Sequence, residues 1–189
     1  YKRQDQIFDK LHGKEISYNN LLDIESALDL IDDLPLTTVV IIKHNNACGA
    51  ATRDKLRDAW EAALECDPVS AYGGIIVTNV PIDEDSASAI DKVFCEVIIA
   101  PDFDTEALGV LKQKKNRIIL KRKEHVASDV KYRSLLNGVL WQERDTKTET
   151  GDEMKPVTVR VPGPAETDDL IFANIIVKHS KSNAIVLAK

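Results

Sequence analysis

Short apolar runs rich in Val and Ile alternate with amphipathic stretches over the first two thirds of the chain. The apolar runs predict buried strands at 39–42, 75–79, 96–101 and 117–121. Between them, apolar residues recur at helical spacing and predict helices at 17–33, 54–66, 83–93 and 105–112. Strands separated by helices of about ten residues predict βαβ units, a mostly parallel sheet and an α/β fold.

The two ends of the chain have a weaker pattern. We expect a polar loop with a short helical piece at 1–15, and an extended, half-buried stretch at 133–143 that bends at Asn137-Gly138. An exposed excursion follows at 145–155. The remaining pattern predicts a short strand at 157–161, a linker at 162–164, a helix at 166–179 and a strand at 184–188.

The strand at 39–42 ends on Lys43-His44, followed by a polar turn with Asn45, Asn46 and Gly49. Ligands of open α/β sheets bind at strand ends. A histidine transfers protons at neutral pH, and a neighbouring lysine can hold an anion or lower the imidazole pKa by like-charge repulsion. The structural alternative, which spacing alone favours slightly, is a surface charge beside a satisfied histidine at a strand end.

The Lys-His pattern recurs in IIVKHSKSN at 175–183. Lys178 also suits the end of a helix, where a cation interacts favourably with the helix dipole. The repeat favours two similar sub-domains with a boundary near Pro162. The first would span 1–161, including the excursion, and 162–189 would begin the second, which the chain truncates.

Other residues are candidates for binding, each with a structural alternative. The turn Ser70-Ala71-Tyr72-Gly73-Gly74 can bring backbone amides close to a flat ligand, or it can be a tight loop. Glu96 can orient a ligand or the histidine, or cap an element. Asn20 and Asn183 can read an amide or purine-like edge, or cap helices.

Composition excludes several classes. A net charge of −6 argues against a general binder of nucleic acid or of membrane surfaces. One basic cluster stands out in this acidic chain, and it comprises Lys112, Lys114, Lys115, Arg117, Lys121, Arg122 and Lys123. The cluster can attract a polyanionic ligand, or it can be a solvated helix end and strand edge. No apolar run approaches the roughly 20 residues of a membrane span, and no signal peptide is recognised before Tyr1.

Motif searches exclude further chemistry. The sequence lacks GxGxxG, GxxxxGK[ST] and GxSxG, and it lacks the H-x-E and P-C-x-x-C pair of zinc deaminases, so no metal site is expected. Three cysteines without CxxC spacing, Cys48, Cys66 and Cys95, favour a reduced cytosolic setting. Because the chain starts on Tyr and stops inside AIVLAK, we expect a fragment of a longer polypeptide.

Five blocks occur in order: KHNNACG, DPVSAYGGIIVTN, EVIIAP, LKQKKN and KHSKSNAIVLAK. Together they resemble the transformylase domain of the bifunctional purine biosynthesis family, which joins AICAR (phosphoribosylaminoimidazolecarboxamide) formyltransferase to IMP cyclohydrolase. The resemblance covers roughly residues 13–189. It implies a three-layer α/β/α fold of cytidine-deaminase-like sub-domains without zinc, and formyl transfer from 10-formyltetrahydrofolate to the 5-amino group of AICAR.

The resemblance also implies roles for individual residues. His44 corresponds to the proton-transfer group, Lys43 to the lysine that assists the reacting centre, and Asn183 to the asparagine that holds the carboxamide and the transferred formyl. The implied substrate-binding residues are Asn20, Val69, Ser70, Tyr72, Gly73 and Glu96, with Glu96 near the folate pterin. A cytoplasmic homodimer with sites shared between subunits is implied as well.

Departures from the family pattern concern one turn and the missing parts. Ala47 replaces the proline of K-H-x-N-P-C-G, which predicts a modest loss of rigidity, and Tyr72 stands where phenylalanine is usual. The phosphate-gripping segment expected before Tyr1, the rest of the second sub-domain and the cyclohydrolase domain lie outside the chain. The alternatives are a non-catalytic fragment or binding module that keeps the fold and, more weakly, a deaminase-like hydrolase.

Overall fold

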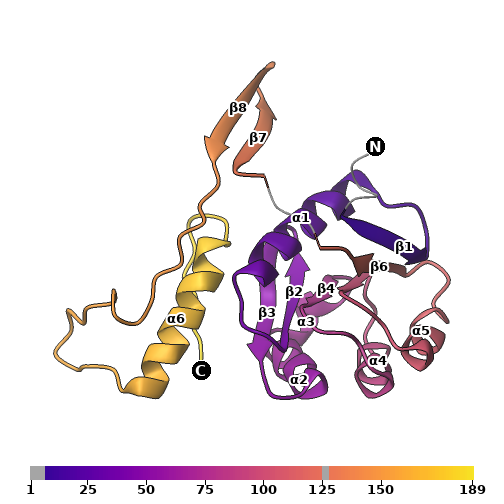
Figure 1. Ribbon diagram of the computed structural model, residues 1–189, viewed down its shortest axis with the longest axis horizontal. Helices are drawn as coiled ribbons and strands as arrows, with labels where there is room; N and C mark the ends of the chain where they lie inside the picture. The colour runs from indigo at the N-terminus through magenta and orange to yellow at the C-terminus, as the bar shows by residue number, and fades with distance from the viewer. Residues whose placement is uncertain (1–6, 125–127) are drawn as a thin grey trace.

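A six-stranded mixed sheet forms the centre of the protein in the computed structural model, which describes residues 7–124 and 128–189 (Figure 1). Its order is β1-β6-β5-β4-β2-β3. The strands are β1 (Phe8–His12), β2 (Thr38–Lys43), β3 (Asn46–Thr52), β4 (Ile75–Thr78), β5 (Val97–Ala100) and β6 (Ile118–Arg122).

The sheet is only partly parallel, which corrects the prediction of a mostly parallel sheet. Strands β4, β5 and β6 are parallel, as the βαβ pattern predicted, but β1, β2 and β3 pair antiparallel with their neighbours. The predicted polar turn at 45–49 is largely strand β3. A turn of two residues, His44-Asn45, separates it from β2, and such a short connection permits only antiparallel pairing.

Helices cover both faces of the sheet, so the predicted three-layer α/β/α architecture is confirmed. One face packs against α2 (Leu56–Cys66), α4 (Glu84–Ile90) and α5 (Thr105–Leu111), which lie along one side of the sheet in Figure 1, and a short helix α3 (Pro68–Ala71) follows α2. The other face packs against α1 (Tyr18–Asp32) and α6 (Pro164–Lys178).

Alternation along the central strands explains this arrangement. In β4, the side chain of Ile76 joins the core cluster under α2, whereas those of Ile75 and Val77 join the cluster under α1. Helix α6 contributes Ile175 and Ile176 to the second cluster, and both are less than a tenth exposed. Strands buried on both faces therefore appear in the sequence as unbroken Val/Ile runs.

Helix α1 begins as the sequence predicted. Ser17 Oγ accepts a hydrogen bond from the backbone N–H of Asn20 at 3.1 Å, and Asn20 Oδ1 accepts one from the backbone N–H of Ser17, which completes a capping box. The predicted helical piece within 1–15 was wrong for Phe8–His12, which is strand β1. Residues 1–6 lie outside the described part of the chain.

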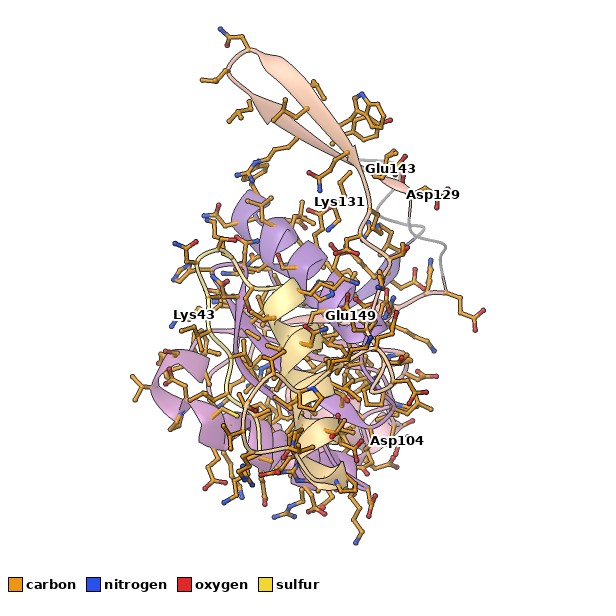
Figure 2. The ribbon with its side chains drawn as sticks, turned by 90° about the vertical axis from the view of Figure 1, so that its left-hand side faces the viewer. Lys43, Asp104, Asp129, Lys131, Glu143 and Glu149 are labelled. Atoms are coloured by element: carbon orange, nitrogen blue, oxygen red, sulfur yellow. The ribbon has the colours of Figure 1, made fainter. Side chains whose placement is uncertain are left out.

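Residues 128–144 form an exposed hairpin rather than a half-buried stretch. Strands β7 (Val130–Leu135) and β8 (Gly138–Glu143) project away from the sheet (Figure 1), with Tyr132 70% and Trp141 65% exposed. At the base of the hairpin, where Lys131 is labelled in Figure 2, Asp29 of α1 pairs with Lys131 and Arg144, both at 2.5 Å. The bend lies at Leu136-Asn137, one residue before its predicted place.

Two short strands predicted near the C-terminal end are absent from the described chain. Residues 157–161 are irregular, with bends at 158–160 and with Val157 and Val159 fully exposed, and residues 184–188 have no regular structure. Alternating apolar residues form a strand only where a neighbouring strand supplies hydrogen bonds, and neither segment has one among the described residues. The irregular excursion at 145–155 is as predicted, and α6 begins at Pro164, two residues before its predicted start.

None of the helices in the described parts of the chain is long and apolar enough to cross a membrane.

Candidate active site

A groove of about 700 Å³ opens where β2 ends and where β4 and β5 begin. Six of the nine predicted site residues line it: Asn20, Lys43, His44, Tyr72, Gly73 and Glu96. Because β2 runs antiparallel to β4, the carboxyl end of β2 lies beside the amino ends of the parallel strands. The groove is therefore at the opposite edge from the usual ligand site of a parallel sheet.

The Lys43-His44 pair lies at the tip of the β2–β3 hairpin, well away from the exposed β7–β8 hairpin (Figure 2). His44 and Asn45 both have positive φ, +54° and +64°, the backbone required by the tightest hairpin turns. Lys43 Nζ donates a 2.8 Å hydrogen bond to the carbonyl oxygen of Tyr72. The His44 side chain is exposed, and its ring nitrogens have no hydrogen-bond partner within residues 7–124 and 128–189.

Glu96 carries a fixed negative charge on the groove wall. Its carboxylate accepts hydrogen bonds from Asn20 Nδ2 at 3.1 Å and Lys14 Nζ at 3.3 Å. The hydrogen bond from Asn20 lowers the pKa of Glu96 below its ordinary value. Partial burial opposes this shift, and the positive charge of Lys14 adds to it. Asn20 is 7% exposed, and its side chain both completes the capping box of α1 and donates to Glu96.

The segment after α2 forms the opposite wall. Asp67 accepts a 2.9 Å hydrogen bond from the backbone N–H of Ser70, which starts α3. Hydrogen bonding by the Ser70 side chain, and then by its backbone, lowers the pKa of Asp67. Gly73 has φ of +77° and donates a 2.7 Å bond to the carbonyl of Phe94. Tyr72 packs on the Phe94 ring with centroids 5.2 Å apart. Ser70 and the 83% exposed Val69 lie outside the groove lining.

The second Lys-His pair makes structural contacts. Lys178 and His179 both bind the Asp33 carboxylate at the end of α1, at 2.9 and 2.6 Å, and so fasten the end of α6 to the protein. Burial of Asp33 opposes its ionisation, but the hydrogen bonds from His179 and Lys178 outweigh burial and lower its pKa.

The segment after α6 returns to the groove. The backbone N–H of Lys181 donates a 2.8 Å hydrogen bond to Asn46 Oδ1, next to His44. Lys181 lines the groove, whereas Asn183 is exposed and lies outside the lining.

Six polar residues of the groove were not predicted as site residues: Lys14, Ser17, Asn19, Asp23, Asn45 and Lys181. Some of these residues could have been found by their closeness in sequence to predicted site residues. Asn19 and Asp23 lie near Asn20, and Lys181 lies in the KHSKSN block. Lys14 joins them only through folding, because its partner Glu96 is 82 residues away.

Ion pairs account for most of the predicted basic cluster. Arg117 is buried and binds Asp91 at 2.6 Å, while Lys121 binds Asp102, Arg122 binds Asp32 and Lys123 binds Asp9. These contacts favour the structural explanation over a polyanion site.

Within the described ranges, no three His, Cys, Asp or Glu side chains are grouped so as to hold a metal ion. All three cysteines are free thiols, and burial raises the pKa of Cys95 to about 11. The polar groups that line the groove are lysine, histidine, carboxylate, amide and hydroxyl groups.

Comparison with known proteins gives a consistent result. The family model for the AICARFT/IMPCHase bienzyme matches residues 1–189. The bifunctional purine biosynthesis protein PurH of Bacteroides thetaiotaomicron is 57% identical over 189 residues, 100% of this chain and 37% of the relative. PurH of Chlorobium phaeobacteroides is 45% identical over 98% of this chain and 36% of its own length.

PurH of Persephonella marina is 46% identical over 95% of this chain and 35% of the relative. The chain thus spans little more than a third of the length of these curated relatives. The match of the family model to the whole chain, together with the 57% identity to one of its members, shows that the chain belongs to the AICARFT/IMPCHase bienzyme family.

Proposed function

We propose that the intact protein acts in purine biosynthesis and transfers a formyl group from 10-formyltetrahydrofolate to the 5-amino group of AICAR, giving formyl-AICAR. The observation that carries the proposal is the Lys43-His44 turn on the wall of a groove that also contains Asn20, Glu96 and Gly73. Membership of the bienzyme family and the PurH relatives support the same reaction.

The proposed chemistry needs a base and a donor to the acyl oxygen. The AICAR amine is a poor nucleophile, because its lone pair is delocalised into the imidazole ring and hydrogen-bonded to the carboxamide. His44, exposed and without a hydrogen-bond partner in the described chain, is free to accept the amine proton. Lys43 supplies positive charge beside the oxyanion that develops during acyl transfer, and Asn183 would hold the carboxamide and the formyl group.

The proposed substrates fit the groove in size and polarity. Its volume of about 700 Å³ falls within the range of about 300–1,000 Å³ that is usual for small-molecule sites. Asn20 and Glu96 offer an amide and a carboxylate to the nitrogen-rich rings of AICAR and the folate pterin. We assign Val69, Ser70, Tyr72 and Gly73 to the opposite wall, with the exposed Tyr72 ring offering an apolar face.

We also propose a cytoplasmic homodimer in which both subunits contribute to each site. The exposed apolar side chains of the β7–β8 hairpin support an association surface, since monomers rarely expose contiguous apolar patches of this kind. Light scattering of the intact protein tests the assembly, and a mass of one chain contradicts it.

The experiment that tests the function is a formyl-transfer assay of the intact protein with AICAR and 10-formyltetrahydrofolate. The His44→Ala variant is expected to lose about a hundredfold or more in kcat, the usual contribution of a general base. Unchanged turnover in that variant contradicts the role of His44. Binding of both substrates without turnover by the intact wild-type protein instead favours the alternative, a binding module that keeps the fold.

A further inference from the structure

The position of the His44 imidazole depends on the backbone of its turn. Its ring nitrogens have no partner in residues 7–124 and 128–189, so no side-chain bond fixes the ring. The turn itself has two consecutive residues of positive φ, His44 and Asn45. Such a backbone costs free energy for residues other than glycine and persists only where surrounding contacts hold it.

Asn45 supplies those contacts. Its backbone N–H donates to Asp23 Oδ1 at 2.7 Å, and its side-chain Nδ2 donates to Leu22 O at 2.8 Å and to Ser26 Oγ at 2.9 Å. All three acceptors belong to helix α1, within the segment from Leu22 to Ser26. One residue thus ties the strained turn to a helix that is buried along the sheet.

We propose that Asn45 is a positioning residue for proton transfer: its clamp on α1 holds the backbone of His44 so that the imidazole faces the groove. This inference rests on the proposed function, because the ring it positions is the proposed base. A general base must lie within hydrogen-bond reach of its proton, and a misplacement of about 1 Å can cost on the order of a hundredfold in rate.

A simpler explanation is that position 45 requires only a residue that tolerates positive φ, as asparagine does. Glycine separates the two explanations, because it adopts positive φ without strain and has no side chain to donate to Leu22 and Ser26. Asn45→Gly therefore removes the two side-chain bonds and keeps the backbone conformation accessible.

The test uses the intact protein and steady-state kinetics with both substrates varied. Asn45→Gly is expected to lower kcat about tenfold and leave both KM values within about twofold, since the base is displaced and the substrate contacts remain. The shape of the pH–rate profile should be unchanged, because the titrating groups are the same. Ser26→Ala, which removes one acceptor, is expected to give a smaller fall in kcat.

Asn79→Ala is the matched control. Asn79 is also an asparagine tether, with its Nδ2 2.7 Å from Pro35 O and its Oδ1 accepting from Thr38 N at 3.0 Å, but at the other end of β2. The Asn79→Ala variant is expected to have a lower melting temperature than the wild type and an unchanged kcat per folded site. Wild-type kcat in Asn45→Gly, a rise in KM alone, or an equal loss in Asn79→Ala each overturns the inference. An inactive wild-type protein overturns the proposed function itself.

Discussion

Asn46 Oδ1 accepts a 2.8 Å hydrogen bond from the backbone N–H of Lys181, and this bond joins two segments that are 135 residues apart in sequence. It brings the segment after α6 against the turn that carries His44. Asn183, the proposed carboxamide-binding residue, follows two positions later. The contact therefore couples the two repeats of the Lys-His pattern at one site, although the second pair itself is bound to Asp33.

If this bond delivers Asn183 to the groove, Asn46 and Asn183 act as one unit. We expect Asn46→Ala and Asn183→Ala each to lower kcat, and the double variant to lose little more than the worse single variant. Coupling of about 0.5–3 kcal/mol is usual for residues of one network. A double-mutant cycle on kcat measures it, and strictly additive losses would contradict the coupling.

Lys43 is expected to act through both its charge and its contact with Tyr72. The bond from Nζ to the Tyr72 carbonyl fastens the end of β2 to the opposite wall. Lys43→Met should lower kcat/KM about a hundredfold, the order of loss seen when one donor to a developing oxyanion is removed, with the fold intact by circular dichroism. Lys112→Met, at an exposed position that follows α5, is the control and should retain full activity.

The elements that could be predicted from the sequence are those whose own residues are apolar enough to indicate burial. The strands around Ile41, Ile76 and Ile98 are apolar on both faces, so their pattern needs no neighbour to be recognised. Strand β3 was missed because NACGAAT contains turn-forming residues and only one β-branched residue. Its extended form comes from pairing with β2, including a bulge at Cys48 between Ala47 and Gly49.

The candidate site was predictable to the same extent. Lys43 and His44 end a conspicuous buried strand, so the sequence itself marks them. Lys14 reaches the groove through Glu96, and Lys181 reaches it through Asn46, over 82 and 135 residues respectively. No local pattern encodes such contacts, because they depend on how β1, β5 and α6 pack.

The carboxylate of Asp33 should make the free energy of unfolding depend on pH. The folded protein lowers the pKa of Asp33 from its ordinary value of 3.8. The contribution of its carboxylate to the free energy of unfolding is therefore fully present above pH 3.8, and it is lost as the pH falls through the lower pKa of the folded state. Asp33→Asn is expected to reduce the free energy of unfolding at pH 7 by about 1.5 kcal/mol, as for hydrogen bonds to a charged group.

Urea unfolding at pH 7 and pH 3 measures this effect. The gap in unfolding free energy between wild type and Asp33→Asn should be largest at pH 7 and should narrow at pH 3. Asp29 also has a lowered pKa, but it is present in both proteins and cancels in the comparison. A gap that stays constant over this range would show that Asp33 acts without its charge.

Among the glycines beside the groove, Gly49 should tolerate substitution least. A Cβ at this position would lie 2.0 Å from the carbonyl oxygen of Ala63 in α2, and that backbone atom can move only if the helix moves. Gly49→Ala is expected to lower the free energy of unfolding by about 3 kcal/mol, the upper range for overpacked sites. Activity should fall too, because β3 carries Asn46.

Gly109→Ala is the matched control for that substitution. Gly109 lies within α5, and a Cβ there would meet nothing within 4 Å, so no clash opposes the change. Alanine in a helix interior restricts the unfolded chain and should raise the free energy of unfolding by about 0.5 kcal/mol. Thermal and urea unfolding of both variants should therefore give shifts of opposite sign. Equal tolerance at the two positions would mean that α2 and β3 separate easily, which contradicts a rigid support for the His44 turn.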